Sequence, residues 1–197
     1  MKSFSEYYKD LLEWEGVDAQ ELITNWNLNL IAEVIADFEQ SITGSSLKGS
    51  LCRLREKSSN QSIGNQVEAF AIEKLNQQLQ VFTIENCSGA GYPDRVLTKG
   101  ESRHIALEFK ATSDWNPTDS NRRVLTSSSK KLRDKFVLPI YHLLCTVIYQ
   151  IEGESARVAA VRLDFLEPTT QVSVRLEASV NHKTLTGAEH QSIVFWD

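Results

Sequence analysis

The sequence predicts a mixed α/β protein in which a central sheet is flanked by helices. Amphipathic helical patterns occupy the first part of the chain, and from Ser62 a helical pattern gives way to short apolar segments separated by glycines. The 197 residues are 41% hydrophobic and 24% charged, as expected for one globular unit with a sizeable core. We therefore expect a single domain over residues 1–197, with a helical N-terminal subregion at 1–60, a core at 62–165 and strands at 166–197.

The N-terminal subregion carries three helix signals. Capping-box patterns begin at Ser3 and at Asp18, each with a glutamate three residues later. From Asn27 to Ile42, apolar residues recur on one stripe, which predicts an amphipathic helix. The small polar stretches Gly44–Ser50 and Lys57–Ser62 are typical of loops, and they separate these helices from the rest of the chain.

The core is predicted to run in the order helix, three strands, helix, strand, strand. A first helix is expected over residues 62–79. A polar loop at 113–125 leads to a second helix, which is capped within residues 126–129 and stops before Pro139. Strands are expected at Val81–Glu85, Asp94–Leu97, His104–Lys110, 140–151 and Ala156–Phe165, followed by edge strands at Gln171–Ala178 and Ser192–Trp196.

Composition also limits the class of protein. Cys52, Cys87 and Cys145 are odd in number and widely spaced, which favours reduced core thiols over disulfides or a zinc site. No apolar run approaches the roughly 20 residues of a membrane span, and the first residues lack the apolar stretch of a secretory signal. The expectation is a cytoplasmic protein without a membrane partner.

A group of charged residues is predicted where two strands meet. Because alternate residues of a strand share a face, Glu108 and Lys110 point one way with residues 104 and 106, while the apolar residues 105, 107 and 109 point the other way. Asp94 begins the preceding strand. If the two strands pair as a hairpin through residues 98–102, two carboxylates and one ammonium converge within a few ångströms.

This grouping suits phosphodiester hydrolysis. Carboxylate oxygens are ligands that Mg²⁺ prefers, and the ion stabilises charge on phosphoryl oxygens while making its bound water a better nucleophile. A lysine beside that water can orient it and lower its pKa further. The hypothesis requires Asp94 to lie within about 10 Å of Glu108, since ligands farther apart cannot share one cation.

Pro93-Asp94 followed by Glu108-Phe109-Lys110 resembles the motif of the PD-(D/E)xK nucleases, the class that includes many type II restriction endonucleases. The element order over residues 62–165 is also similar to the αβββαβ core of that restriction-endonuclease-like fold. The resemblance implies a Mg²⁺-dependent nuclease in which Asp94 and Glu108 bind the metal and Lys110 assists the attacking water.

Members of this family often add a glutamate from the first core helix to the catalytic residues. Glu68, within the predicted helix at 62–79, matches that position and could face the same site.

The segment that follows Lys110 is a candidate DNA-binding element. The formal net charge of −5 argues mildly against a nucleic-acid partner, but basic residues concentrate between Arg122 and Lys135. The helix expected there can hold a phosphate at its N-terminus, arginines can read guanine, and asparagine can read adenine. The candidate DNA-binding residues are Asn116, Asn121, Arg122, Arg123, Ser128, Lys130 and Lys131.

Structural interpretations compete with each functional one. Asp94, Glu108 and Lys110 could belong to a solvated hairpin whose cross-strand ion pair contributes about 0.2–1 kcal/mol. Glu68 could be an ordinary exposed helix residue, and the basic segment could be a solvated face. His104 is left out of the site because a single histidine at a strand start is more often simply solvated, while His142 lies in an apolar run and is expected to be a core residue.

The favoured function is Mg²⁺-dependent cleavage of double-stranded DNA at a specific sequence, as by a type II restriction endonuclease. Palindromic sites are commonly read by symmetric dimers, so a homodimer is expected, with the N-terminal helices as its interface. The alternatives are a repair or junction-resolving nuclease that recognises DNA shape, and a catalytically inactive DNA-binding module of the same fold.

Overall fold

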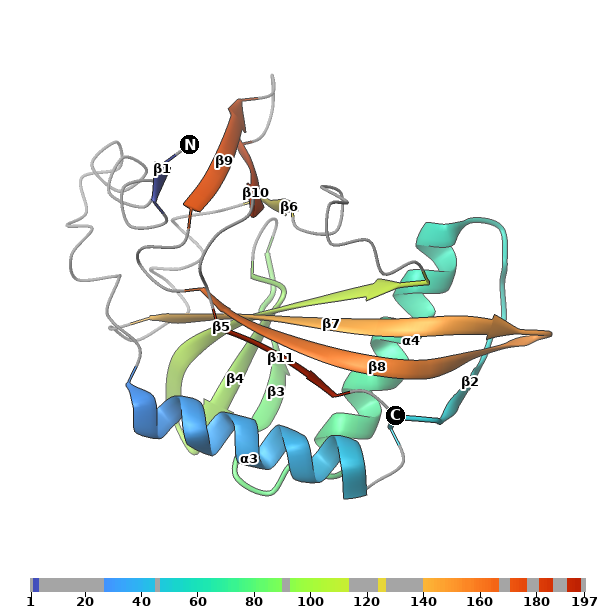
Figure 1. The fold of residues 1–197 in the computed structure, drawn as a ribbon, viewed down its shortest axis with the longest axis horizontal. Coiled ribbons are helices and arrows are strands. Elements are labelled where there is room, and N and C mark those ends of the chain that lie inside the picture. Colours follow the sequence, from blue (N-terminus) through green and yellow to red (C-terminus); the bar gives the residue numbers. More distant parts are fainter. Residues whose placement is uncertain are drawn as a thin grey trace.

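The computed structural model describes residues 2–3, 27–44, 47–89, 93–113, 124–126, 140–166, 171–176, 181–185 and 191–195. Its main feature is a curled seven-stranded sheet (Figure 1). The strands of this sheet are β2 (Leu51–Arg53), β3 (Thr83–Asn86), β4 (Arg95–Lys99), β5 (Ser102–Thr112), β7 (Tyr141–Glu152), β8 (Ser155–Leu166) and β11 (Gln191–Phe195). Their order is β11-β8-β7-β5-β4-β3, and β2 also pairs with β8.

Two helices pack against this sheet, α3 (Leu28–Gly44) and α4 (Asn60–Asn76). Both confirm helices predicted from periodicity. The Asn27 side chain caps α3 by accepting the Asn29 N–H at 3.0 Å. Ser59 caps α4 by accepting the Ser62 N–H at 3.1 Å, so part of the predicted loop Lys57–Ser62 is the first turn of α4. A hydroxyl-rich stretch predicts either a loop or a helix cap, and here it provides the cap.

The sheet is mixed, with both antiparallel and parallel strand pairs. β4 and β5 form an antiparallel hairpin that turns at Gly100, whose φ of 61° favours glycine. β5 then pairs in parallel with β7, and β7 returns through Gly153 as the long antiparallel strand β8. β5 therefore lies inside the sheet, with β4 on one side and β7 on the other. The parallel pairing requires a crossover connection between β5 and β7, and most of that connection lies outside the described residues.

The two faces of the sheet differ in polarity. On one face, alternate residues of β5, β7 and β8 join α3 and α4 in the hydrophobic core; they include Ile105, Leu107, Phe109, Leu143, Cys145, Leu163 and Phe165. The opposite face carries buried polar side chains, namely Glu108, Thr112, His142, Thr146, Arg162 and Asp164. The apolar residues of β5 share one face, as predicted, and they are buried; the opposite, polar face is buried as well.

A second sheet of four strands departs from the predicted architecture. It consists of β1 (Lys2–Ser3), β6 (Val124–Thr126), β9 (Gln171–Leu176) and β10 (Asn181–Leu185), in the order β1-β9-β10-β6. The first residues of the chain thus pair with a strand near its end.

Several predicted elements need correction. Ser3 lies in a strand instead of capping a helix, and Val124–Thr126 is a strand where a loop and a helix cap were expected. β9 lies between β1 and β10, so it is not an edge strand. The short strands β2 and β10 were not predicted. Local patterns do not show which distant segments pair, and such pairing determines these strands. The remaining helices expected before Asn27 and after Thr126 lie outside the described residues.

Buried groups agree with other expectations. All three cysteines are free and buried, and His142 is 2% exposed, as predicted for core residues. In the part of the chain that the structure describes, no helix has the length and apolar character needed to cross a membrane.

A buried aspartate on α3 fixes where β3 begins. Asp37 is 3% exposed, and its carboxylate accepts the backbone N–H groups of Gln80, Val81 and Phe82 at 2.8, 3.0 and 2.9 Å. These bonds attach α3 to the turn between α4 and β3, and thereby to the β3-β4-β5 strands.

We predict that Asp37→Ala lowers the free energy of unfolding by about 3 kcal/mol or more, because it leaves buried N–H donors without acceptors. Urea denaturation monitored by circular dichroism measures the loss. Glu39→Ala, at an exposed position on the same helix, is the control and should change stability by less than about 0.5 kcal/mol. Equal effects of the two substitutions would contradict the assigned role of Asp37.

Candidate active site

Asp94 is held by its backbone at the start of β4. Its carbonyl accepts the Cys87 N–H at 2.9 Å, which extends the β3-β4 ladder by one bond. Its own N–H donates to Oε2 of Glu108 at 3.2 Å. Asp94 itself is exposed. The two acidic residues therefore lie well within the separation that a shared cation requires, and the Asp94 carboxylate remains accessible.

Glu108 lies on the polar face of β5 and is 4% exposed. Its Oε1 accepts Nζ of Lys110 at 2.7 Å, while Oε2 accepts the Asp94 N–H. The shared face follows from strand alternation, because Glu108 and Lys110 are two residues apart. Burial excludes the solvated-hairpin interpretation for Glu108. An ionised carboxylate is stable in such a place only when it is paired and hydrogen-bonded.

The site forms where β5 loses one neighbour. The last β4-β5 register pair is Arg95 with Leu107, so β5 beyond this point pairs with β7 alone. Helix α4 covers this open edge. The helix and the strand approach closely at Gly64 of α4, where a side-chain Cβ atom would lie 3.7 Å from the carbonyl oxygen of Ala111 on β5. Glu68 follows one helical turn later on the same side of α4, and the helix thus brings a third carboxylate to the open edge.

Glu68 is electrostatically coupled to the other site residues. Burial raises the pKa of the Glu68 carboxyl to about 7, with the Lys110 ammonium opposing this shift and the Glu108 and Asp94 carboxylates adding to it. Glu68 is only partly exposed, which differs from the ordinary exposed helix residue of the competing interpretation.

Glu108 and Lys110 stabilise each other against burial. Desolvation raises the pKa of the Glu108 carboxyl, and the Lys110 ammonium opposes this shift. For Lys110, desolvation acts to lower the pKa, but the Glu108 carboxylate outweighs it and the pKa is raised. The lysine therefore remains an ammonium at neutral pH, suited to donating hydrogen bonds and unsuited to accepting a proton.

The donor set is compatible with a hard divalent cation. Both oxygens of Glu108 retain acceptor capacity beyond the single bond that each receives, and the Asp94 carboxylate is exposed. Among the described residues, no three histidine, cysteine, aspartate or glutamate side chains are positioned to hold one metal ion. Two carboxylates are sufficient for Mg²⁺, which commonly keeps several water ligands and takes others from substrate phosphates.

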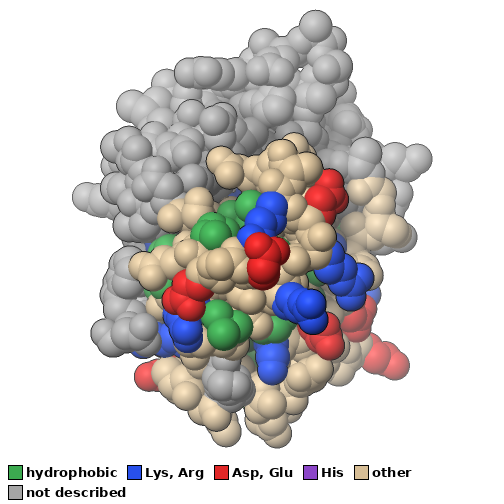
Figure 2. Space-filling model, turned by 90° about the vertical axis from the view of Figure 1, so that its right-hand side faces the viewer, with side chains coloured by type: hydrophobic (Ala, Val, Ile, Leu, Met, Phe, Trp, Pro, Cys, Tyr) green, Lys and Arg blue, Asp and Glu red, His purple; other side chains and the backbone are tan. Residues whose placement is uncertain are grey.

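All of the predicted DNA-binding residues lie outside the described part of the chain; they are Asn116, Asn121, Arg122, Arg123, Ser128, Lys130 and Lys131. Figure 2 shows basic and acidic side chains interspersed on the described part of the face that lies to the right in Figure 1. Mixed charge of this kind does not produce the single-sign field that attracts a phosphate backbone.

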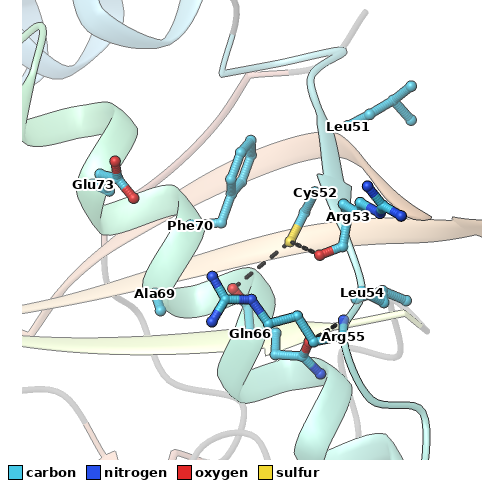
Figure 3. Close-up of a pocket in the computed structure, with 9 residues that line it drawn as sticks. All are labelled: Leu51, Cys52, Arg53, Leu54, Arg55, Gln66, Ala69, Phe70 and Glu73. Atoms are coloured by element: carbon cyan, nitrogen blue, oxygen red, sulfur yellow. Dashed lines mark hydrogen bonds between the residues drawn. The ribbon is translucent and has the colours of Figure 1, made fainter. Parts of the chain in front are cut away.

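A groove of about 900 Å³ lies between β2 and α4 (Figure 3) and is lined by Leu51, Cys52, Arg53, Leu54, Arg55, Gln66, Ala69, Phe70 and Glu73. Gln66 holds the chain after β2 in place by accepting the Arg55 N–H at 2.7 Å. With 3.6 residues per turn, Gln66 and Phe70 lie on the opposite side of α4 from Glu68. The groove is therefore separate from the carboxylate site.

Sequence reasoning missed two groups near the site. Arg95, the residue after Asp94, places its guanidinium beside the Asp94 carbonyl, and the motif pattern gave no reason to select it. Arg162 and Asp164 of β8 form a buried ion pair of 2.6 Å on the same sheet face as Glu108. Their alternation with apolar neighbours in β8 is the signal that could have revealed them.

The chain is similar in overall arrangement to a solved structure of the restriction endonuclease BglI bound to its DNA recognition sequence. The similarity covers 98% of this chain and 94% of that chain, with a TM-score of 0.40 and 12% sequence identity. Neither a protein-family model nor a curated protein matches the sequence. A likeness at this level assigns no function.

The raised pKa of Glu68 has a measurable consequence for stability. In the unfolded chain a glutamate has its ordinary pKa of 4.5, whereas in the folded protein the pKa of Glu68 is about 7. Between these values the folded state binds more protons, so stability contributed by Glu68 is lost as pH rises through this range. We predict that Glu68→Gln raises the free energy of unfolding at pH 8 by about 1–2 kcal/mol, a range that allows for partial solvent screening, and leaves it unchanged at pH 4.

Urea denaturation of metal-free protein at the two pH values tests this. Glu73→Gln, at an exposed position on the far side of α4, is the matched control and should change stability by less than about 0.5 kcal/mol at either pH. A destabilised Glu68→Gln variant at pH 8 would contradict the assignment.

Proposed function

We propose that this protein is a Mg²⁺-dependent endonuclease that hydrolyses phosphodiester bonds of double-stranded DNA. The observation that carries the proposal is the convergence of Asp94, Glu108 and Lys110 at the open edge of β5, with Glu68 brought there by α4. The Glu108-Lys110 pair is buried, and a buried ion pair is stable only when its geometry is good and further hydrogen bonds satisfy its polar atoms. A surface ion pair has no such requirement.

Asp94 and Glu108 are the proposed metal ligands. When bound, the ion supplies charge stabilisation at the phosphoryl group and an acidified water. Lys110 keeps its proton and donates hydrogen bonds, so its proposed role is to orient the attacking water and stabilise developing negative charge at the phosphate. Glu68, with a pKa of about 7, is suited to accept a proton near neutral pH, which is the task of a general base.

We further propose that the protein cleaves DNA at a specific sequence and acts as a homodimer, as type II restriction endonucleases do. A palindromic site presents the same face twice, which a two-fold symmetric protein matches. The proposed DNA-reading residues belong to the connection between β5 and β7. Because β5 ends next to the carboxylate site, this connection begins beside the chemistry and could place base contacts close to the scissile phosphate.

We predict that Asp94→Asn lowers the cleavage rate of unmethylated phage DNA in Mg²⁺ by at least about 100-fold, because it removes a charged metal ligand. The Asp94 side chain is exposed and its backbone N–H remains in place for Glu108, so the substitution should leave the unfolding temperature unchanged. Gel electrophoresis of the products measures the rate, and EDTA should abolish cleavage by the wild type.

Glu101→Gln makes the same chemical change at an exposed position in the β4-β5 turn, and it should cleave at the wild-type rate. Lys110→Ala should also be inactive, although it leaves buried Glu108 without its cation and is expected to lose about 3–5 kcal/mol of stability. Wild-type cleavage rates in both Asp94→Asn and Lys110→Ala would show that this site does not carry the activity.

The pattern of products distinguishes restriction from its alternatives. We predict discrete plasmid fragments with fixed ends, and a dimeric mass in sedimentation equilibrium. Nicking that depends on branched or mismatched structures would instead identify a repair or junction-resolving nuclease. Retention of DNA without cleavage in Mg²⁺ would identify an inactive binding module.

A further inference from the structure

Arg95 approaches the candidate site from the side of α4. It is the first residue of β4, and its register partner Leu107 belongs to the apolar, helix-covered face. Its Nη1 donates to the carbonyl oxygen of Asp94 at 2.9 Å. The guanidinium is also close enough to Glu68 to oppose the rise in that carboxyl's pKa. Arg95 is therefore close to both Asp94 and Glu68 at the open edge of β5.

The pairing of Arg95 differs from that of other cations on the β4-β5 hairpin. Lys99 pairs with Glu33, Arg103 with Glu85 at 2.8 Å and Lys110 with Glu108 at 2.7 Å. In the described part of the chain, no carboxylate lies within ion-pairing distance of Arg95. The hydrogen bond that its side chain makes there goes to the Asp94 carbonyl.

The Nε of Arg95 is buried and has no hydrogen-bond partner among the described groups. A buried donor without an acceptor costs about 1–3 kcal/mol. An anion can reach Nε only if the side chain shifts and exposes this atom, and the new hydrogen bond would then recover this energy. A guanidinium offers five N–H donors in a planar fork, and pairs of these donors match the oxygens of a phosphate. The unpaired state of Arg95 thus favours a phosphate ligand over a structural partner within the protein.

We infer that Arg95 is a substrate-binding residue that donates hydrogen bonds to non-bridging oxygens of a DNA phosphate at the carboxylate site. The inference rests on the proposed nuclease function and extends it by naming a phosphate contact outside the Asp94, Glu108, Lys110 and Glu68 set. Arg95 positions the phosphate and offsets its charge near three carboxylates. The contact involves no proton transfer, because an arginine does not deprotonate in proteins.

The test compares Arg95→Gln and Arg95→Lys with Arg103→Gln. Arg103 is on the same hairpin and its substitution removes the same charge, but its guanidinium already pairs with Glu85. Binding of a fluorescent DNA duplex is measured in Ca²⁺ over a series of salt concentrations. Cleavage of phage DNA in Mg²⁺ and thermal unfolding are measured in parallel.

We predict that Arg95→Gln reduces the slope of log binding constant against log salt by about 1, as expected for one lost phosphate contact. Its kcat/KM should fall by about 100-fold. Arg95→Lys should retain the salt slope but lose part of kcat/KM, since an ammonium lacks the planar fork. Arg103→Gln should match the wild type in both. The unfolding temperature of Arg95→Gln should not fall, because loss of the bond to the Asp94 carbonyl is offset by removal of the buried Nε that has no acceptor.

The outcomes separate the two proposals. If the wild type cleaves DNA and Arg95→Gln has the salt slope and kcat/KM of Arg103→Gln, the inference about Arg95 is wrong and the proposed function stands. A lowered unfolding temperature in Arg95→Gln with an unchanged salt slope would identify a structural residue and also overturn it. If the wild type neither cleaves nor binds the duplex, the proposed function fails and the inference fails with it.

Discussion

The candidate site depends on keeping one carboxylate charged inside the sheet. Glu108 is 4% exposed, and burial alone would favour its neutral form. The Lys110 ammonium and the Asp94 N–H each bond to one of its oxygens and stabilise the ionised state. Lys110 belongs to β5, like Glu108, and Asp94 directly precedes β4. The charge on Glu108 therefore depends on the geometry of the β4-β5 hairpin. A shift of one residue in the register would move Glu108 and Lys110 to the apolar face.

The open edge of β5 explains why the site forms at this place. Beyond the pair that β5 forms with Arg95, the first residue of β4, one backbone edge of β5 has no strand partner, and such an edge can be covered by a helix. Helix α4 takes this role, and its close approach to β5 at Gly64 brings Glu68, one helical turn later, to the group. α3 supports the arrangement from a distance, since Asp37 accepts three backbone N–H groups at the entry to β3. The positions of the carboxylates thus depend on the packing of α4 against β5 and on the bonds from α3 to the start of β3.

The polar face of the sheet extends beyond the catalytic candidates. In register, Glu108 aligns with Leu144 and Asp164 across β5, β7 and β8, and Lys110 aligns with Thr146 and Arg162. Arg162 and Asp164 pair with each other through bonds of 2.6 and 2.8 Å, and neither has a buried side-chain nitrogen or oxygen left without a hydrogen-bond partner. Arg95, in contrast, has a buried nitrogen without an acceptor. The Arg162-Asp164 pair is therefore structural, whereas Arg95 has a hydrogen-bond donor that an external anion could use.

The sequence by itself determined the helices α3 and α4, the order of the core strands and the shared face of Glu108 and Lys110, because periods of 3.6 and 2 are local properties of the chain. Only the tertiary structure decided that this face is buried, that β5 pairs in parallel with β7, and that Glu68 and Arg95 reach the same edge. It also decided the four-stranded sheet, in which residues 2–3 pair with a strand at 171–176. Burial and strand pairing arise from contacts between residues far apart in the sequence, so no local pattern contains them.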